Sequence, residues 1–165
     1  MPSAEHDRLT QLAGRWLKRN GFGVVATELT CMGSRERPDA IGFRSEASAI
    51  VEVKVSRADF LADAAKPERR VGGLGLYRFY LCPAGMIRPD ELPPRWGLLY
   101  ASNRSVELVV GPPGNAWLRA ADGLHEAVLD MPWSAEWIAF QHSPDLGAER
   151  SALYSIARRA MSGRG

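Results

Sequence analysis

The stretch Ala49-Ile50-Val51-Glu52-Val53-Lys54-Val55 combines an almost continuous apolar run with two opposite charges. Its β-branched residues favour a strand, and strand alternation places the valines on one face and Ile50, Glu52 and Lys54 on the other. In a central strand, Glu52 and Lys54 lose water and need compensating partners. In an edge strand they face solvent as an ordinary ion pair. The segment alone leaves both interpretations open.

The elements around this strand predict an α/β fold. An amphipathic helix is expected over 3–20, with Ser3 as its cap and Asn20-Gly21 as its end. A second, short helix over 56–65 has a capping Ser56 and places three apolar residues on one side, which are Phe60, Leu61 and Ala64. Further strands are expected at three segments rich in Val, Ile, Phe and Tyr, which are 22–31, 40–43 and 76–82. Because a helix connects the third strand to the fourth, those two strands should pair in parallel.

Beyond this core the sequence predicts a hairpin and a helical tail. Strands at 96–101 and 106–110 flank a polar turn, and helices follow at 134–142 and 146–161. In the last helix we expect an apolar stripe formed by Leu153, Ile156, Ala157, Ala160 and Met161. We therefore expect a single domain over 1–165, with a core at about 3–110 and a C-terminal addition at about 111–165.

Composition restricts the classes of protein. A chain of 165 residues that is 45% hydrophobic and 24% charged is typical of a globular domain and excludes a disordered chain. The net charge of +2 is too small to indicate nucleic-acid binding by itself, although only 3 of the 21 basic residues are lysines. No apolar run approaches the roughly 20 residues of a membrane span, and the N-terminus lacks a signal-peptide pattern. We expect a cytoplasmic protein with no membrane partner. Cys31 and Cys82 lack the spacing of a zinc site or a disulfide framework.

Asp39, which follows Pro38, is the expected partner of Glu52. If the second and third strands form an antiparallel hairpin, Asp39 lies at the same end of the sheet as Lys54 and within reach of Glu52. Mg²⁺ typically takes one or two protein carboxylates and completes its shell with water and substrate oxygens. Asp39 and Glu52 are therefore candidate metal ligands, with the Val53 carbonyl as a third. Lys54 would orient a water or neutralise charge on a phosphate.

A third carboxylate is expected from the first helix or the first strand. Glu5 lies four residues before Leu9, on the helix face that we expect to turn toward the sheet, so its side chain should point inward. The alternatives are that Glu5 is an ordinary acidic residue of a first helical turn and that Glu28 takes this role. His6 is the histidine nearest the expected site, and we expect it to be a surface residue.

Pro38-Asp39, twelve intervening residues and Glu52-Val53-Lys54, set in the order helix-strand-strand-strand-helix-strand, resemble the PD-(D/E)XK nuclease superfamily and its Holliday-junction-resolvase-like branch. More narrowly, the runs 37–39, 51–63, 77–81 and 92–99 resemble the MmcB-like family of proposed DNA-repair nucleases, which includes phage-encoded relatives. This likeness covers about half of the chain.

The resemblance implies a restriction-endonuclease-like core with a mixed central sheet, to which the hairpin and the C-terminal helices are added. It implies Mg²⁺ or Mn²⁺ as cofactor, DNA as partner, Asp39 and Glu52 as ligands, and Lys54 as the catalytic lysine, with Glu5 completing the site. The expected function is that of a metal-dependent deoxyribonuclease, and an endonuclease is expected rather than an exonuclease. Its expected role is in DNA repair, recombination or phage DNA processing. A homodimer is compatible with this function. The alternative is an inactive nuclease-fold module that binds DNA or protein.

Polar and basic residues that follow the expected site are the candidates for contacts with DNA phosphates. They are Ser56, Arg57, Lys66, Arg69 and Arg70.

Overall fold

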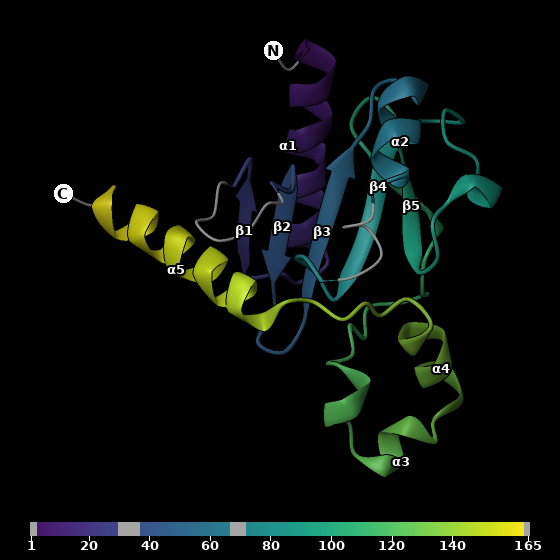
Figure 1. The fold of residues 1–165 in the computed structure, drawn as a ribbon, viewed down its shortest axis with the longest axis vertical. Coiled ribbons are helices and arrows are strands. Elements are labelled where there is room, and N and C mark those ends of the chain that lie inside the picture. The colour runs from purple at the N-terminus through teal and green to yellow at the C-terminus, as the bar shows by residue number, and fades with distance from the viewer. Residues whose placement is uncertain (1–2, 30–36, 67–71, 164–165) are drawn as a thin grey trace.

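The structure is a computed structural model that describes residues 3–29, 37–66 and 72–163 (Figure 1). Its first part has the expected order, namely α1 (Ala4–Arg19), β1 (Val24–Thr27), β2 (Ala40–Phe43), β3 (Ser48–Val53), α2 (Arg57–Ala64) and β4 (Tyr77–Pro83). The remainder comprises η2 (Pro89–Glu91), β5 (Trp96–Ala101), β6 (Val106–Val110), η3 (Ala121–Gly123), α3 (Glu126–Leu129), α4 (Pro132–Ile138) and α5 (Leu146–Ser162).

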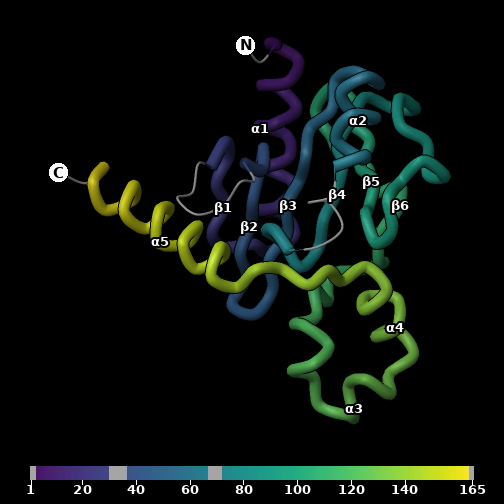
Figure 2. Tube along the Cα trace, viewed as in Figure 1, coloured from purple at the N-terminus to yellow at the C-terminus, as the bar shows by residue number. Residues whose placement is uncertain are grey.

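The strands form one six-stranded mixed sheet in the order β1-β2-β3-β4-β5-β6. β3 pairs with β4 and β4 with β5 in parallel, whereas the other pairs are antiparallel. Figure 2 follows the chain into β6, the last strand of the sheet. The expected α/β class, the parallel β3–β4 pair and the hairpin are confirmed.

Local signals explain where the two core helices begin. The Ser3 hydroxyl accepts a hydrogen bond from the His6 amide at 3.1 Å, and the Ser56 hydroxyl accepts one from the Asp59 amide at 3.2 Å. After α1 the chain turns at Gly21, whose φ of 82° lies in the left-handed region that favours glycine. Of the strand expected over 22–31, the structure shows β1 over Val24–Thr27, and Glu28 with a φ of 54° leaves the extended conformation directly after it. Residues 30 and 31 of that expectation lie outside the described residues.

The two faces of the sheet carry two separate cores. α1 covers one face, where Leu9, Ala13 and Leu17 pack on a cluster that includes Val51 and Val53. α2 and the first half of α5 cover the other face (Figure 1). Every residue of β3 is buried, so the central-strand interpretation of Glu52 is correct and the edge-strand interpretation is wrong.

The C-terminal part joins these cores at two places. Trp117 and Trp137 pack into the α1-side cluster. α5 is attached through Glu149, whose carboxylate accepts hydrogen bonds from the Ser48 hydroxyl at 2.5 Å and the Gly75 amide at 3.0 Å. No helix in the described ranges is both long enough and apolar enough to cross a bilayer.

Of the apolar stripe expected on α5, only Ile156 packs against the core. The buried line consists of Ala152 with the partly buried Ala148 and Ile156, whereas Leu153 and Met161 are exposed. The reason is that only the first half of α5 lies against the sheet, while the rest extends past β1 (Figure 1). The expected extent of the helix is confirmed to within one residue, whereas the expected buried side is confirmed only at Ile156.

Acid should destabilise the fold through His142. Burial lowers the pKa of His142 to about 4 from 6.5, and the positive charges of Arg78 and Arg95 act in the same direction. Because the unfolded chain takes up this proton near pH 6.5 and the folded chain only near pH 4, the free energy of unfolding should fall as the pH drops through this interval. A difference of this size corresponds to about 3 kcal/mol.

Urea denaturation of the wild type and of His142→Gln across pH 4 to 7 measures this contribution. The variant should show a shallower loss of stability than the wild type below about pH 6.5. Equal pH dependence in the two proteins would contradict the assignment to His142.

Candidate functional site

The strand registers place three carboxylate-bearing residues in one row across the sheet. β2 and β3 pair Ala40 with Val51, so the preceding residue, Asp39, lies opposite Glu52. β1 and β2 pair Thr27 with Ala40, and the row continues through a hydrogen bond from the Glu28 amide to the Asp39 carbonyl at 2.8 Å. Directly opposite residues in an antiparallel pair share a face and lie about 5 Å apart between Cβ atoms. Asp39 and Glu52 are therefore brought together as expected.

Asp39 is held in place from two sides. One carboxylate oxygen, Oδ2, accepts a hydrogen bond from the Val53 amide at 2.8 Å. The other, Oδ1, lies 3.2 Å from Nε2 of His6, which reaches it from the first turn of α1. The carboxylate thus joins the start of β2 both to the end of β3 and to α1.

Lys54 extends the strand beyond Glu52 and meets a carboxylate of α2. Its amide donates to the Leu81 carbonyl at 2.9 Å, so the extended pairing with β4 continues and Lys54 stays on the Glu52 face. Its ammonium nitrogen, on a side chain only 13% exposed, lies 3.4 Å from the carboxylate of Asp63. Asp63 is 4% exposed in its side chain and also accepts a hydrogen bond from the Tyr80 hydroxyl at 2.8 Å.

The expectation for the inner face of α2 was partly wrong. Phe60 is fully buried, but Leu61 is exposed, and Asp63 takes the sheet-facing position three residues after Phe60. The sequence signal for Asp63 is its i, i+3 spacing from Phe60, which an apolar pattern search passes over because the residue is charged. Its burial is explained by Lys54 and Tyr80.

Glu5 does not point inward as expected. Its side chain is 45% exposed, and both carboxylate oxygens accept hydrogen bonds from Arg8, at 2.8 and 2.9 Å. The Arg8 hydrogen bonds hold the pKa of the Glu5 carboxyl below its ordinary value. The buried residues of α1 explain the error, because Thr10, Ala13 and Leu17 follow His6 at helical spacing and turn that residue inward.

His6 therefore takes the place that was expected for Glu5, and it is not a free surface residue. Together with Asp7 and Glu28, it offers three ligand atoms that all lie within 4.8 Å of one another. Glu28 reaches this group because its left-handed backbone turns its side chain away from strand alternation. Of Glu5 and Glu28, Glu28 is the residue that lies next to Asp39 in the sheet.

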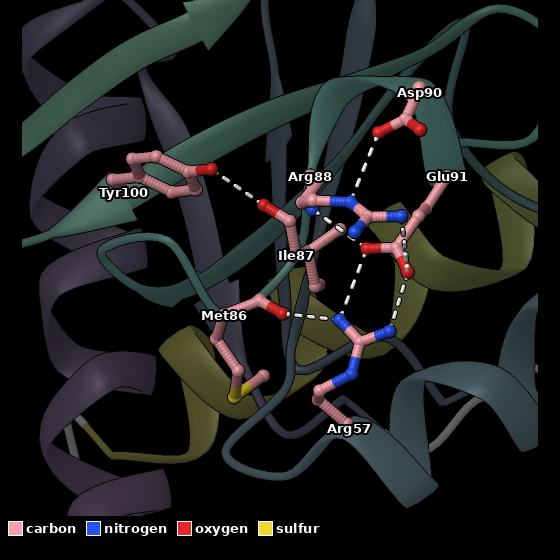
Figure 3. A network of polar contacts seen from close by, with 7 residues as sticks. All are labelled: Arg57, Met86, Ile87, Arg88, Asp90, Glu91 and Tyr100. Carbon is pink, nitrogen blue, oxygen red and sulfur yellow. Dashed lines mark hydrogen bonds and ion pairs between the residues drawn. The ribbon is translucent and has the colours of Figure 1, made fainter.

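Two of the candidate DNA contacts are used within the protein. Ser56 caps α2. The Arg57 guanidinium donates to both oxygens of Glu91, at 2.5 and 3.1 Å, and to the Met86 carbonyl at 2.7 Å (Figure 3). The hydrogen bonds from Arg57 and from the Arg88 amide lower the pKa of Glu91 to about 2. Arg57 thus links α2 to η2, and both terminal nitrogens of its guanidinium group already donate hydrogen bonds within the protein.

The other candidate contacts lie near the end of α2. The Lys66 ammonium lies 3.6 Å from Asp63 and remains largely exposed. Arg69 and Arg70 fall outside the described residues.

The donor set of Asp39 and Glu52 fits a hard divalent cation. Both ligands are carboxylates, they lie opposite each other on neighbouring strands, and Asp39 Oδ2 has a second lone pair beyond the hydrogen bond that it accepts from the Val53 amide. Glu52 is 4% exposed, so its carboxylate is largely removed from competing water. Soft ligands are absent from this pair, which favours Mg²⁺ or Mn²⁺ over zinc.

Comparison with known proteins yields a fold but no activity. No family model matches the chain, and no curated protein matches it significantly. A solved structure, the SPO1766 protein of unknown function from Silicibacter pomeroyi, is similar with a TM-score of 0.62 and 21% sequence identity. The similarity covers 99% of this chain and 94% of that chain. The architecture is therefore shared over nearly the whole length of both proteins.

Asp63→Asn should destabilise the protein by on the order of 3 kcal/mol, because it removes the carboxylate that compensates the buried Lys54 ammonium. Urea denaturation measures this cost. The double variant Lys54→Met/Asp63→Asn should recover most of the loss, since neither charge then remains. Asp59→Asn, on the exposed side of the same helix, serves as the control and should cost less than about 1 kcal/mol. An equal effect of the two single variants would show that the buried pair has no special role.

Proposed function

We propose that the protein is a metal-dependent nuclease that hydrolyses DNA phosphodiester bonds, with Mg²⁺ or Mn²⁺ held by Asp39 and Glu52. The observation that carries this proposal is the alignment of Asp39 opposite Glu52, with Lys54 two residues further along the same strand face. Two oxygen ligands beside an ammonium group are what a phosphoryl-transfer site requires. The resemblance to PD-(D/E)XK nucleases rests on these same three residues.

In the proposed reaction a water oxygen bonds to phosphorus, one phosphorus–oxygen ester bond breaks, and the proton of the water passes to the leaving oxygen. A bound divalent cation polarises the phosphate and lowers the pKa of water. Asp39 and Glu52 would hold that cation, and the carbonyl of Val53, which follows Glu52 in sequence, would offer a further oxygen. The contacts of Asp39 with the Val53 amide and with His6 fix its carboxylate before substrate binds.

Lys54 supplies positive charge to the phosphate. Its ion pair with Asp63, which the Tyr80 hydroxyl also holds, restricts where the ammonium group can lie. Such a fixed charge stabilises the negative charge that develops in the transition state without having to reorient. In this proposal Asp63 positions Lys54 and does not itself touch the substrate.

The proposed setting follows from the substrate. An endonuclease of this kind would act in the cytoplasm on DNA during repair, recombination or phage DNA processing, and two copies would allow both strands to be cut. Glu5, which pairs with Arg8, is not needed in this scheme, and Glu28 is the better placed third carboxylate.

A second candidate function is a nuclease-fold module that binds DNA or a protein without turnover. The observation that favours it is the ion pair between the Lys54 ammonium and Asp63. A lysine with a purely structural role would form the same ion pair. The two candidates differ in whether the carboxylate pair supports metal-dependent cleavage.

Asp39→Asn and Glu52→Gln should each reduce Mg²⁺-dependent cleavage of labelled DNA by at least about a hundredfold, because each removes one charged ligand. The matched control is Asp90→Asn, since Asp90 also follows a proline but is largely exposed on η2. Cleavage is measured on single-stranded, duplex, flapped and branched DNA with Mg²⁺ or Mn²⁺. Full activity in either ligand variant would eliminate the proposed pair, and no activity in the wild type on any substrate would favour the binding module.

Lys54→Met should lower the cleavage rate by about a hundredfold while leaving Mn²⁺ affinity unchanged, because the ammonium acts on the phosphate and not on the cation. Methionine keeps the length of the buried stem, and a thermal melt by circular dichroism checks that the variant folds. Lys54→Arg should restore part of the rate. Loss of Mn²⁺ binding together with activity would instead assign Lys54 to the integrity of the metal site.

A further inference from the structure

A groove with a volume of about 670 Å³ lies between α1 and the β5–β6 hairpin, on the opposite side of the sheet from Glu52. Three arginines line it, namely Arg15 and Arg19 of α1 and Arg104 of the hairpin turn. Leu12, Trp16 and Val106 are its apolar lining residues. The groove thus combines three guanidinium groups with an apolar lining that includes one aromatic ring.

The three arginines are available to an external anion. All three are exposed, and none of them forms an ion pair within residues 3–29, 37–66 and 72–163. Arg57 and Arg119, in contrast, are paired with carboxylates, namely those of Glu91 and Glu46. Like charges gathered without counter-ions on one rim repel one another, and a bound polyanion would relieve this repulsion.

The groove is built on rigid elements. Arg8 of α1 donates to the carbonyls of Ser102 and Asn103, at 3.3 and 3.0 Å, and so ties the hairpin turn to the helix. Trp16 packs edge-on against Phe79 and Trp117, with ring centroids 5.2 and 6.0 Å apart. A site whose walls are fixed before binding loses less entropy when its ligand arrives.

The combination of arginines with an aromatic wall indicates one class of ligand. Guanidinium groups donate in a planar fork that matches phosphate oxygens, and aromatic rings stack on unpaired bases irrespective of sequence. An acidic peptide would also satisfy the charges, but it would make no specific use of the part of the half-buried Trp16 indole that lines the groove beyond its contacts with Phe79 and Trp117. We propose that the groove between α1 and the β5–β6 hairpin binds the backbone of a single-stranded nucleic acid through Arg15, Arg19 and Arg104.

Arg104, in the hairpin turn, lies at the same end of the sheet as the carboxylate pair. β3, β4 and β5 are parallel, so the hairpin turn after β5 lies at the end where Lys54 follows β3. A strand bound in the groove can pass over this turn toward Glu52. That connection rests on the proposed function, whereas binding in the groove does not depend on catalysis.

The test is fluorescence anisotropy with a fluorescein-labelled oligothymidylate of about 20 nucleotides, longer than the usual site of a single-strand-binding domain. EDTA prevents cleavage during the measurement. Arg15→Ala/Arg19→Ala/Arg104→Ala should bind at least about tenfold more weakly than the wild type. The slope of log affinity against log salt concentration should be smaller in magnitude by about 2 in this variant. Each of the three lost phosphate contacts with a single strand removes about 0.7 from that slope.

The control is Arg150→Ala/Arg158→Ala/Arg159→Ala, which makes the same change in net charge on α5 and should bind almost as the wild type does. Replacement of the three groove arginines by lysine should keep the salt dependence. Equal losses in the two alanine triples, no binding by the wild type, or equal displacement of the probe by polyglutamate would overturn the proposal. Glu52→Gln should bind the oligonucleotide as the wild type does. If the wild type binds in this way but cleaves no DNA substrate with Mg²⁺ or Mn²⁺, only the nuclease proposal is refuted.

Discussion

The antiparallel register between β2 and β3 is the constraint on which the whole site depends. It places Asp39 opposite Glu52, and the hydrogen bond from the Val53 amide to Asp39 fastens the two strands just where regular pairing ends. A slip of one residue would turn the side chain of Asp39 to the opposite face of the sheet from that of Glu52. Gly42 supports this register, because a Cβ at that position would lie only 2.9 Å from Cβ of Phe22.

Burial gives this register a chemical consequence. Glu52, Lys54 and Asp63 lie in the interior between the sheet and α2, where each isolated charge would be costly. Lys54 and Asp63 offset this cost for each other, and Tyr80 holds Asp63 from the next strand. An apolar strand therefore carries charges in fixed positions, and fixed charges are what distinguish a candidate site from an ordinary surface ion pair.

The sequence predicted most of what depends on local pattern. The bounds of β2, β5 and β6 were expected to the residue, because turn-forming residues flank short apolar runs, and the crossover through α2 predicted the parallel β3–β4 pair. The antiparallel pairing of β2 with β3 also predicted that Asp39 lies opposite Glu52.

What the sequence did not predict depends on tertiary contacts. The direction of the Glu5 side chain depends on which side of α1 is buried. That side is centred on Ala13 and Leu17, so His6 faces the site in place of Glu5. The burial of Asp63 depends on Lys54 and Tyr80, which lie on other elements. The groove beside Arg104 likewise depends on how α1 lies against the β5–β6 hairpin, to which Arg8 is hydrogen-bonded.

A crystal of the protein soaked in manganese tests the central account most directly, because the anomalous signal locates the ion independently of activity. The account predicts a peak between the carboxylates of Asp39 and Glu52, with metal–oxygen distances of about 2.1 to 2.2 Å. A peak among His6, Asp7 and Glu28 alone, or none beside Glu52, would contradict it.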